Sequence, residues 1–274
     1  MFERVLGNVQ AKTPLVHSVT NYVTVNDCAN IILASGGSPI MADDIGEVCD
    51  ITSICSSLVL NMGTLNERTV ASMIAAGKRA NELGHPVIFD PVGAGASMLR
   101  NRTALTLLQE VRFSVIRGNI SEIKFLATGG GNAQGVDASV ADRVTDATLD
   151  SALRFVKALS AATGAVIAIT GAIDIVADAR SAYVIRNGHP LMSRVTGTGC
   201  MLSAVIGSYT GANPADLLDA TAAAVCAMGL CGELAYERLQ ALDAGTGTYR
   251  SLIIDFMSKL DAKTLREGAK IERK

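Results

Sequence analysis

The chain has 274 residues, of which 49% are hydrophobic, 18% are charged and only 4% are aromatic. Parallel α/β folds commonly hold this length in one unit, so we expect a single domain over residues 1–274 with a large aliphatic core. The 24 basic and 26 acidic residues give a net charge of -2, and no run of Lys or Arg stands out. Nucleic acid is therefore not an expected partner.

The sequence pattern indicates neither a signal peptide nor a membrane-spanning segment. The N-terminal stretch Met1–Leu6 contains an acid and lacks the basic-then-apolar order of a signal peptide. The longest predominantly apolar stretches, such as Ala220–Met228, are well below the roughly 20 residues that span a bilayer. We expect a soluble cytoplasmic protein with no membrane partner.

The cysteines indicate neither a zinc site nor a redox pair. No C-x-x-C pair occurs among the six, and no histidine lies at ligand spacing from them. We expect Cys200 to be functional and the other five to be buried thiols.

Short apolar runs bounded by glycine, proline or asparagine alternate with longer stretches of helical period, which is the pattern of βα units. The runs do not alternate with polar residues, which predicts strands covered on both faces. The predicted fold class is α/β, with a mostly parallel central sheet flanked by helices on both faces. In chain order we expect strand Ser57–Asn61, helix Glu67–Leu83, strands Val87–Asp90, Ser114–Arg117 and Ala165–Thr170, a hairpin of Asp174–Asp178 with Ala182–Gly188, and from Cys200 onward only helices, among them Met201–Thr210, Ala215–Leu239 and Ser251–Leu260.

Two motifs with carboxylates follow predicted strands. Asp90 leaves its strand just before a proline and two glycines, where it could bind a metal ion directly or through water; a turn-forming aspartate is the alternative. After the next strand, Asn119 and Glu122 are three residues apart at the start of a helix. They could hold a hydrated magnesium ion while Arg117 clamps a phosphate as a planar fork. Equally, Asn119 and Glu122 could form a capping box, and both interpretations can hold together.

Two motifs with glycine also follow strands or open helices. Thr170-Gly171 ends a predicted strand and, taken singly, is an ordinary turn. Gly197–Cys200 opens a helix, where the free N–H groups and the helix dipole favour an anion, although a plain helix entry has the same spacing. A helix N-terminus also favours a thiolate, so Cys200 could accept the proton of a primary alcohol or orient it; an inert core cysteine is the alternative. Glycines 129–131 follow a helix instead, and we expect a flexible connection there.

Together these strings resemble the hydroxyethylthiazole kinase family of the ribokinase-like superfamily. Gly197–Cys200 is similar to the superfamily's G-x-G-D or G-x-G-C signature, and the thiazole kinases resemble this chain in carrying Cys at the last position. The D-P-V-G string at Asp90, the N-x-x-E string at Asn119 and the N-terminal segments 16–23 (VHSVTNYV) and 38–42 (SPIMA) occur in the family's order. The resemblance spans essentially the whole chain from Val16 onward.

The resemblance implies ATP- and Mg²⁺-dependent phosphorylation of the hydroxyl of 4-methyl-5-(2-hydroxyethyl)thiazole in thiamine salvage, by a homotrimer with sites between neighbouring subunits. His17 is expected to be structural, and a lone methionine is more often core than ligand contact. The implied roles are catalysis at Cys200, metal binding at Asp90 and Glu122, nucleotide binding at Arg117, Asn119, Thr170 and Gly171, and substrate binding at Asn21, Met41 and Gly197.

Three rival functions stay open. A kinase of another vitamin precursor, of the hydroxymethylpyrimidine or pyridoxal type, would share the fold, but the N-terminal segments argue against it. A nucleotide-dependent dehydratase of hydrated NAD(P)H would call for an acid in place of Cys200. A non-catalytic nucleotide-binding protein is the third. A Rossmann oxidoreductase is disfavoured because no G-x-G-x-x-G follows the first strand.

Overall fold

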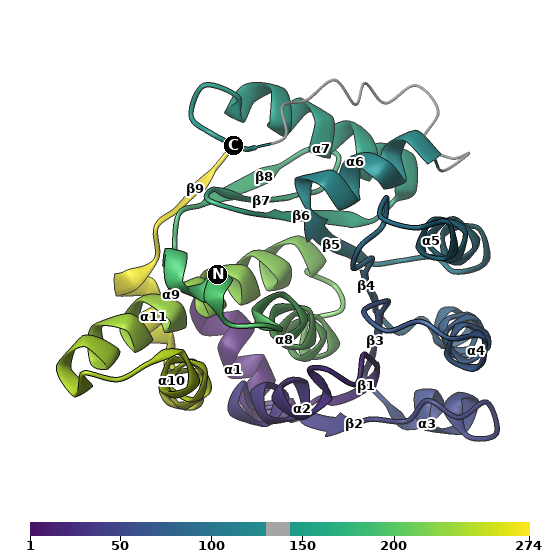
Figure 1. The fold of residues 1–274 in the computed structure, drawn as a ribbon, viewed down its shortest axis with the longest axis horizontal. Helices are drawn as coiled ribbons and strands as arrows, with labels where there is room; N and C mark the ends of the chain where they lie inside the picture. Colours follow the sequence, from purple (N-terminus) through teal and green to yellow (C-terminus); the bar gives the residue numbers. More distant parts are fainter. Residues whose placement is uncertain (130–142) are drawn as a thin grey trace.

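The computed structural model describes residues 1–129 and 143–274 (Figure 1). The last two glycines of the run at 129–131 lie outside the described residues, so the flexible connection expected there stays a prediction. The strands are β1 Leu15–Val19, β2 Ser38–Ile40, β3 Ser57–Asn61, β4 Val87–Asp90, β5 Val115–Asn119, β6 Val166–Thr170, β7 Asp174–Ala177, β8 Ala182–Ile185 and β9 Ile271–Arg273. The helices are α1 Phe2–Lys12, α2 Val25–Ala34, α3 Val48–Ile54, α4 Glu67–Leu83, α5 Met98–Glu110, α6 Ile120–Gly129, α7 Leu149–Thr163, α8 Thr198–Ala212, α9 Leu217–Leu242, α10 Thr246–Lys259 and α11 Ala262–Gly268, with a short 3₁₀ helix at Pro190–Arg194.

The strands described form one sheet in the order β2-β1-β3-β4-β5-β6-β7-β8-β9. The pairs from β2 to β6 are all parallel, and those from β6 to β9 are antiparallel. The predicted mostly parallel sheet and the β7–β8 hairpin are confirmed. The expectation that only helices follow Cys200 is wrong, because β9 pairs with β8 at the edge of the sheet.

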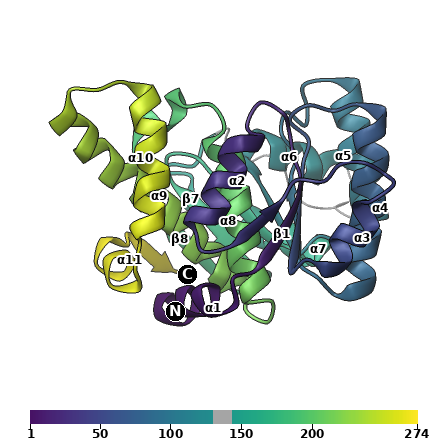
Figure 2. The same cartoon turned by 90° about the horizontal axis from the view of Figure 1, so that it is seen from below.

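Helices cover both faces of the sheet, as expected (Figures 1 and 2). Helices α3 to α7 pack on one face, and α1, α2, α8, α9 and α10 lie on the other. Successive strand residues point to opposite faces. Thus Val59 and Ile88 belong to the core on the α8 side, whereas Leu58, Leu60 and Phe89 belong to the core on the α4 side. This two-sided burial is why the strands read as continuous apolar runs.

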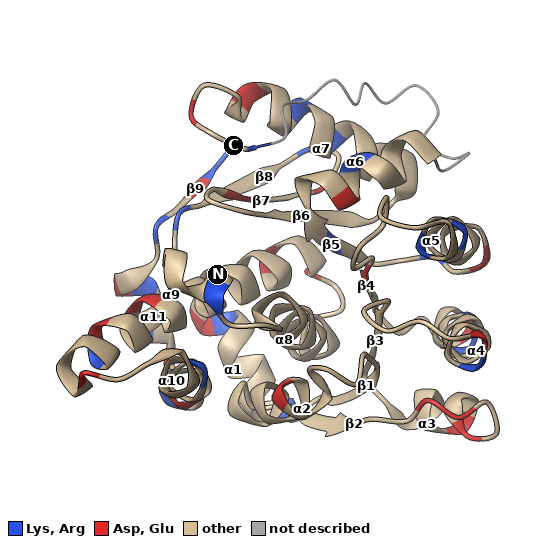
Figure 3. Cartoon of the chain, in the orientation of Figure 1, with Lys and Arg blue, Asp and Glu red and all other residues tan. Residues whose placement is uncertain are grey.

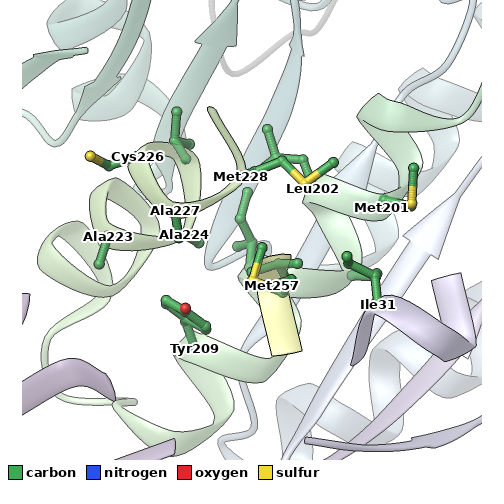
Figure 4. Close-up of a cluster of buried hydrophobic side chains, with 14 of the residues drawn as sticks. Ile31, Met201, Leu202, Tyr209, Ala223, Ala224, Cys226, Ala227, Met228 and Met257 are labelled. Atoms are coloured by element: carbon green, nitrogen blue, oxygen red, sulfur yellow. The ribbon is translucent and has the colours of Figure 1, made fainter. Parts of the chain in front are cut away.

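The core on the α8 side is built mainly from two helices of small and sulfur-bearing side chains. Figure 4 shows Met201, Leu202 and Tyr209 of α8 beside Ala223–Met228 of α9. Helix α9 is long and apolar enough to cross a membrane by length and composition, which contradicts the expectation that no stretch approaches that size, but 72% of its most apolar window is buried inside the fold. It is a core helix here.

The cysteine expectation is correct at four positions and wrong at one. All six cysteines are free thiols, and Cys28, Cys55, Cys226 and Cys231 are buried. Cys49 is exposed, because it lies on the short helix α3 at the outer side of the molecule. Cys200 is half-buried.

Candidate active site

The polar residues that the sequence places at strand tips meet at the carboxyl edge of the parallel sheet. Asn61 and Asp90 are the last residues of β3 and β4 and are directly paired in register. Asn119 and Thr170 end β5 and β6 and are likewise paired. Parallel α/β sheets bind their ligands at this edge, outside the carboxyl ends of the strands. Figure 3 shows charged residues on the outer helices, while α8, which packs against β1, β3 and β4 on one face of the sheet, carries none along its length.

Asp90 is a completely buried carboxyl group. Its Oδ2 accepts hydrogen bonds of 2.8 Å from Asn61 Nδ2 and from the hydroxyl of Ser203. Its Oδ1 has no hydrogen-bond partner among the described residues and lies 3.6 Å from Nη1 of Arg117. Burial raises the pKa of the Asp90 carboxyl, and the Arg117 charge and the two hydrogen bonds oppose that rise.

Arg117, on β5, connects this carboxyl to the next strand. Its Nη2 donates a 2.7 Å hydrogen bond to Oγ1 of Thr170, and its Nε has no partner among the described residues. The guanidinium lies over Gly199, where a Cβ would stand 2.6 Å from Nη1. The lack of a side chain at Gly199 therefore lets the cation lie against the first turn of α8.

Asn119 and Glu122 form the capping box that the sequence allowed. Asn119 Oδ1 accepts the N–H of Glu122 at 2.9 Å, and Glu122 Oε2 accepts the N–H of Asn119 at 2.8 Å. Oε1 of Glu122 accepts the N–H of Gly93 at 2.8 Å, which ties the loop after β4 to α6. Burial raises the pKa of the Glu122 carboxyl, those two N–H groups oppose the rise, and the charge of Asp90 adds to it. The charge of Asp90 thus disfavours the ionised form of Glu122, and the charge of Arg117 favours it.

The first turn of α8 carries the candidate catalytic thiol. Gly197 precedes the helix with a φ of 86°, in the left-handed region, and an added Cβ there would clash with the Thr24 side chain. The N–H groups of the first turn have no partner within the helix, which makes this end suited to an anion. The Cys200 sulfur accepts a hydrogen bond of 3.3 Å from Asn21 Nδ2. The thiol is thus hydrogen-bonded to a buried polar side chain, that of Asn21.

The turn after β6 carries a carboxyl that titrates near neutrality. Oδ1 of Asp174 accepts the N–H of Gly171 at 2.8 Å, which closes the Thr170–Asp174 turn. Burial raises the pKa of Asp174 to about 7, and the Gly171 N–H and the Arg117 charge oppose that rise. The charge of Arg117 therefore influences the protonation of the Asp174 carboxyl in this turn.

A cavity of about 730 Å³ opens beside these groups. Its lining combines the cations Arg117 and Arg143 and the first turn of α8 with apolar side chains such as Leu202 and Met228. This volume is within the range typical of small-molecule sites. The lining residues are Arg117, Arg143, Thr170, Gly171, Ala172, Asp174, Asn187, Gly188, His189, Pro190, Met192, Ser193, Thr198, Gly199, Leu202, Val225, Met228 and Gly229.

The structure connects several predicted site residues, but only some of them line the cavity. Asp90, Arg117, Glu122, Thr170 and the α8 turn are linked by the contacts above. Met41 is half-buried just after the edge strand β2 and packs against the α8-side core. It is not among the cavity-lining residues described, and neither are Asp90, Glu122 and Cys200. His17 is structural as expected: it is fully buried, its ring nitrogens contact Thr52 Oγ1 and the Ala42 carbonyl, and burial lowers its pKa.

Sequence reasoning missed both side chains that donate hydrogen bonds to Asp90. Asn61 and Ser203 both hydrogen-bond to Asp90, and neither was considered. A signal existed for Asn61, because a polar residue ended a predicted strand at the ligand edge. Ser203 lies in the interior of α8 one turn beyond Cys200, and no local pattern marks it.

Comparison with known proteins decides the family. A sequence profile of the hydroxyethylthiazole kinase family matches residues 6–263. The hydroxyethylthiazole kinase of Clostridium acetobutylicum is 61% identical over 272 residues, covering 99% of this chain and 99% of that protein. The chain belongs to the hydroxyethylthiazole kinase family. The resemblance of the GTGC, DPVG and N-x-x-E strings to this family is therefore confirmed.

Solved structures agree with this membership of the hydroxyethylthiazole kinase family. The structure of a hydroxyethylthiazole kinase protein from Pyrococcus horikoshii superposes with a TM-score of 0.88 at 32% identity, covering all of this chain and 98% of that one. The pyridoxal kinase from Staphylococcus aureus superposes with a TM-score of 0.55 at 13% identity, over 79% of this chain and 87% of that one. The second likeness concerns the fold alone. The fold is ribokinase-like, as the sequence predicted.

Proposed function

We propose that the chain transfers the γ-phosphoryl group of ATP to the hydroxyl of hydroxyethylthiazole in thiamine salvage. Membership of the hydroxyethylthiazole kinase family supports the reaction and the thiazole alcohol as substrate. The observation that carries the proposal is the cavity walled by Arg117, the Thr170–Gly171 turn and the first turn of α8, with the Cys200 thiol on that same turn. Phosphoryl transfer needs positioned positive charge and little covalent chemistry, which this wall can supply.

The phosphates of the nucleotide would lie at the Arg117 end of the cavity. A guanidinium can contact phosphate oxygens as a planar fork, and the first-turn N–H groups of Thr198, Gly199 and Cys200 can donate to developing negative charge. Arg117 lines the cavity, which supports this role. Asn119 is less available to bind the nucleotide, because its Oδ1 already caps α6.

Magnesium would be held near Asp90 and Glu122, and the residues there fit a hydrated ion carried in with the nucleotide. No cluster of three ligating side chains occurs in the described part of the chain. Mg²⁺ commonly needs only one or two carboxylates, with waters and substrate phosphates as its other ligands. The unpartnered Oδ1 of Asp90 offers an acceptor, but Asp90 is fully buried and Glu122 already accepts two backbone N–H groups, which favours contact through water. When bound, the ion would neutralise charge on the transferring group.

Cys200 would face the hydroxyl of the alcohol. Its place in the first turn of α8 sets it next to the N–H groups proposed to hold the phosphate, so an alcohol beside it would lie close to the phosphorus. The sulfur could take the hydroxyl proton or orient it as the bond to phosphorus forms. The dehydratase alternative is disfavoured, because a carboxylic acid would be needed where Cys200 stands. The family membership favours a thiazole over a pyrimidine or pyridoxal substrate.

The remaining features of the proposal rest on the family resemblance. We propose one ribokinase-like domain over residues 1–274, a cytoplasmic location and a homotrimer whose sites lie between neighbours, in which Asn21, Met41 and Gly197 contact the thiazole. Met41 would then complete a neighbour's site.

A substrate panel tests the proposed function. Purified protein, ATP and magnesium are incubated with hydroxyethylthiazole, hydroxymethylpyrimidine and pyridoxal, and phosphorylated products are identified by mass. We expect the thiazole phosphate to form fastest by a wide margin. Preferential phosphorylation of the pyrimidine or pyridoxal would reject the substrate assignment, and no ATP consumption with any alcohol would reject the kinase assignment.

A further inference from the structure

The side-chain amides of Asn21 and Asn61 have orientations that neighbouring backbone groups determine. Oδ1 of Asn21 accepts the N–H of Thr24 at 3.1 Å and its hydroxyl at 3.0 Å. Oδ1 of Asn61 accepts the N–H of Gly63 at 2.8 Å. Because a backbone N–H can only donate, both of these amide ends must be carbonyl oxygens. The Nδ2 atom of each amide therefore points away from these backbone N–H groups.

These nitrogen ends connect the Asp90 carboxylate to the Cys200 sulfur. Asn61 Nδ2 donates to Asp90 Oδ2 at 2.8 Å. Asn21 Nδ2 donates to Asn61 Oδ1 at 2.9 Å and to Cys200 Sγ at 3.3 Å. The result is a continuous chain of hydrogen bonds, Asp90–Asn61–Asn21–Cys200, which we call the amide relay. In this relay the sulfur is an acceptor.

The amide relay is buried from Asp90 to Asn21, and it connects the ends of two strands to helix α8. Asn21 is 3% exposed, Asn61 is 2% exposed and Asp90 is fully buried. Asn61 and Asp90 are paired strand residues, whereas Cys200 lies on α8. Buried, fully bonded amides hold one orientation, because turning them would leave polar groups unpaired. The relay thus ties the thiol-bearing turn to the strand tips.

We infer that Asn61 is a positioning residue for phosphoryl transfer, which acts through Asn21 to hold the Cys200 sulfur in place relative to Asp90 with an amide donor turned toward it. The amide N–H bonded to the sulfur fixes the side of the sulfur that faces Asn21. It also leaves the far side of the sulfur for the alcohol. The inference rests on the proposed function, but its first test requires no turnover. If the relay served packing alone, its loss would change stability and leave the sulfur's reactivity unaltered.

The first test measures the alkylation rate of Cys200 by iodoacetamide, without nucleotide or alcohol. A Cys49→Ser background removes the exposed thiol, the other four are buried, and the modified peptide is identified by mass. The thiolate is the reacting species. We expect Asn21→Ala to slow alkylation roughly tenfold and Asn61→Ala about threefold, because a sulfur that has lost the hydrogen bond holding it is less often in a reactive orientation.

Ser203→Ala is the matched control. It removes the other 2.8 Å hydrogen bond to the same Asp90 oxygen and a 3.3 Å contact with the Gly199 carbonyl, but leaves the relay intact, so Cys200 should be alkylated at the rate of the background protein. An unchanged or faster rate in Asn61→Ala would overturn the inference. So would a Ser203→Ala variant slowed as much as Asn61→Ala. Thermal unfolding checks that each variant is folded, and Asn61→Ser replaces Asn61→Ala if the alanine variant is not.

The second test is a double-mutant cycle on kcat with hydroxyethylthiazole. If Asn61 acts through the sulfur, Asn61→Ala should have little further effect once Cys200 is alanine. Losses that multiply would show that Asn61 acts independently of Cys200 and would overturn the inference. Should no thiazole phosphate form at all, the proposed function fails, and the alkylation rates still decide whether the relay controls the thiol.

Discussion

The guanidinium of Arg117 lies against Gly199, so close that a Cβ on this residue would stand 2.6 Å from Nη1 and 3.0 Å from Cζ. The two residues come from β5 and α8, and their contact joins the cation to the helix terminus proposed to bind phosphate. Gly199→Ala must therefore displace Arg117. We expect kcat/KM for ATP to fall at least about tenfold, because a small displacement of a positioning group has effects of this order.

Gly7→Ala is the control for that substitution, since a Cβ at this exposed position on α1 would meet nothing within 4 Å. Its kinetics should match those of the unaltered protein. A Gly199→Ala variant with unaltered kinetics would contradict the proposed place of the phosphates.

Arg117→Lys should impair the enzyme even though it keeps the positive charge. A lysine cannot reproduce the fork that reaches Thr170 Oγ1 at 2.7 Å and faces Asp90 at 3.6 Å. We expect kcat/KM for ATP to fall roughly 10- to 100-fold, the range for losing a hydrogen bond to a charged partner. Steady-state kinetics with varied ATP measure this, with Arg112→Lys, an exposed change outside the cavity, as control. Equal rates for the two variants would show that only charge matters at residue 117.

Glu122→Ala should reduce turnover more than Cys200→Ala does. Loss of the carboxylate removes a proposed magnesium contact and the ties to Gly93 and Asn119, so we expect kcat to fall roughly 10²- to 10³-fold and saturation by magnesium to be lost. Cys200→Ala should retain measurable activity, because phosphate stabilisation provides most of the catalysis. A magnesium titration of kcat in both variants measures the ranking. Equal losses would argue against it.

Asp174→Asn should change how stability depends on pH. Burial raises the pKa of Asp174 to about 7 from an ordinary value of 3.8, so the folded state holds this proton where the unfolded state has lost it. Between these two values the folded state binds more protons, so its stability falls as pH rises through the window and levels off above about pH 7. Asparagine removes the titration but can still accept the Gly171 N–H.

The unfolding temperature of Asp174→Asn, relative to the unaltered protein, should therefore rise from about pH 4 to pH 7 and then level off. Asp150→Asn, which removes one exposed charge on α7, is the control. A difference that stays constant with pH, or that falls, would show that the Asp174 proton is not retained in the folded state.

Where a local pattern marks an element, the sequence predicts the same first and last residues that the structure shows. Strands Ser57–Asn61 and Val87–Asp90 and helix Glu67–Leu83 have the predicted bounds, because each is an apolar run or an amphipathic period closed by a breaker. Strand β1 was missed as a strand because His17 and Ser18 interrupt its apolar run, although both are buried. Strand β9 is short and charged, and it exists through pairing with β8, which no local pattern reveals.

The residues of the site likewise divide into those that a local sequence pattern marks and those that only tertiary packing reveals. Asp90 and Arg117 lie in the last residues of a strand, and Glu122 and Cys200 lie in the first turn of a helix, and this position marks them in the sequence. Their spatial neighbours Asn61 and Ser203 were missed because the hydrogen bonds they make depend on strand register and on how α8 crosses the sheet. Local patterns thus identified the candidate chemical groups, and tertiary packing determines how those groups are held.

The amounts of ADP and thiazole phosphate formed together from ATP and hydroxyethylthiazole test the central claim most directly. We predict equal amounts with the unaltered protein, and a parallel collapse of both products in Arg117→Ala, which removes the cation at the phosphate end of the cavity. ADP formed without thiazole phosphate, or product formation that survives unchanged in Arg117→Ala, would contradict the account.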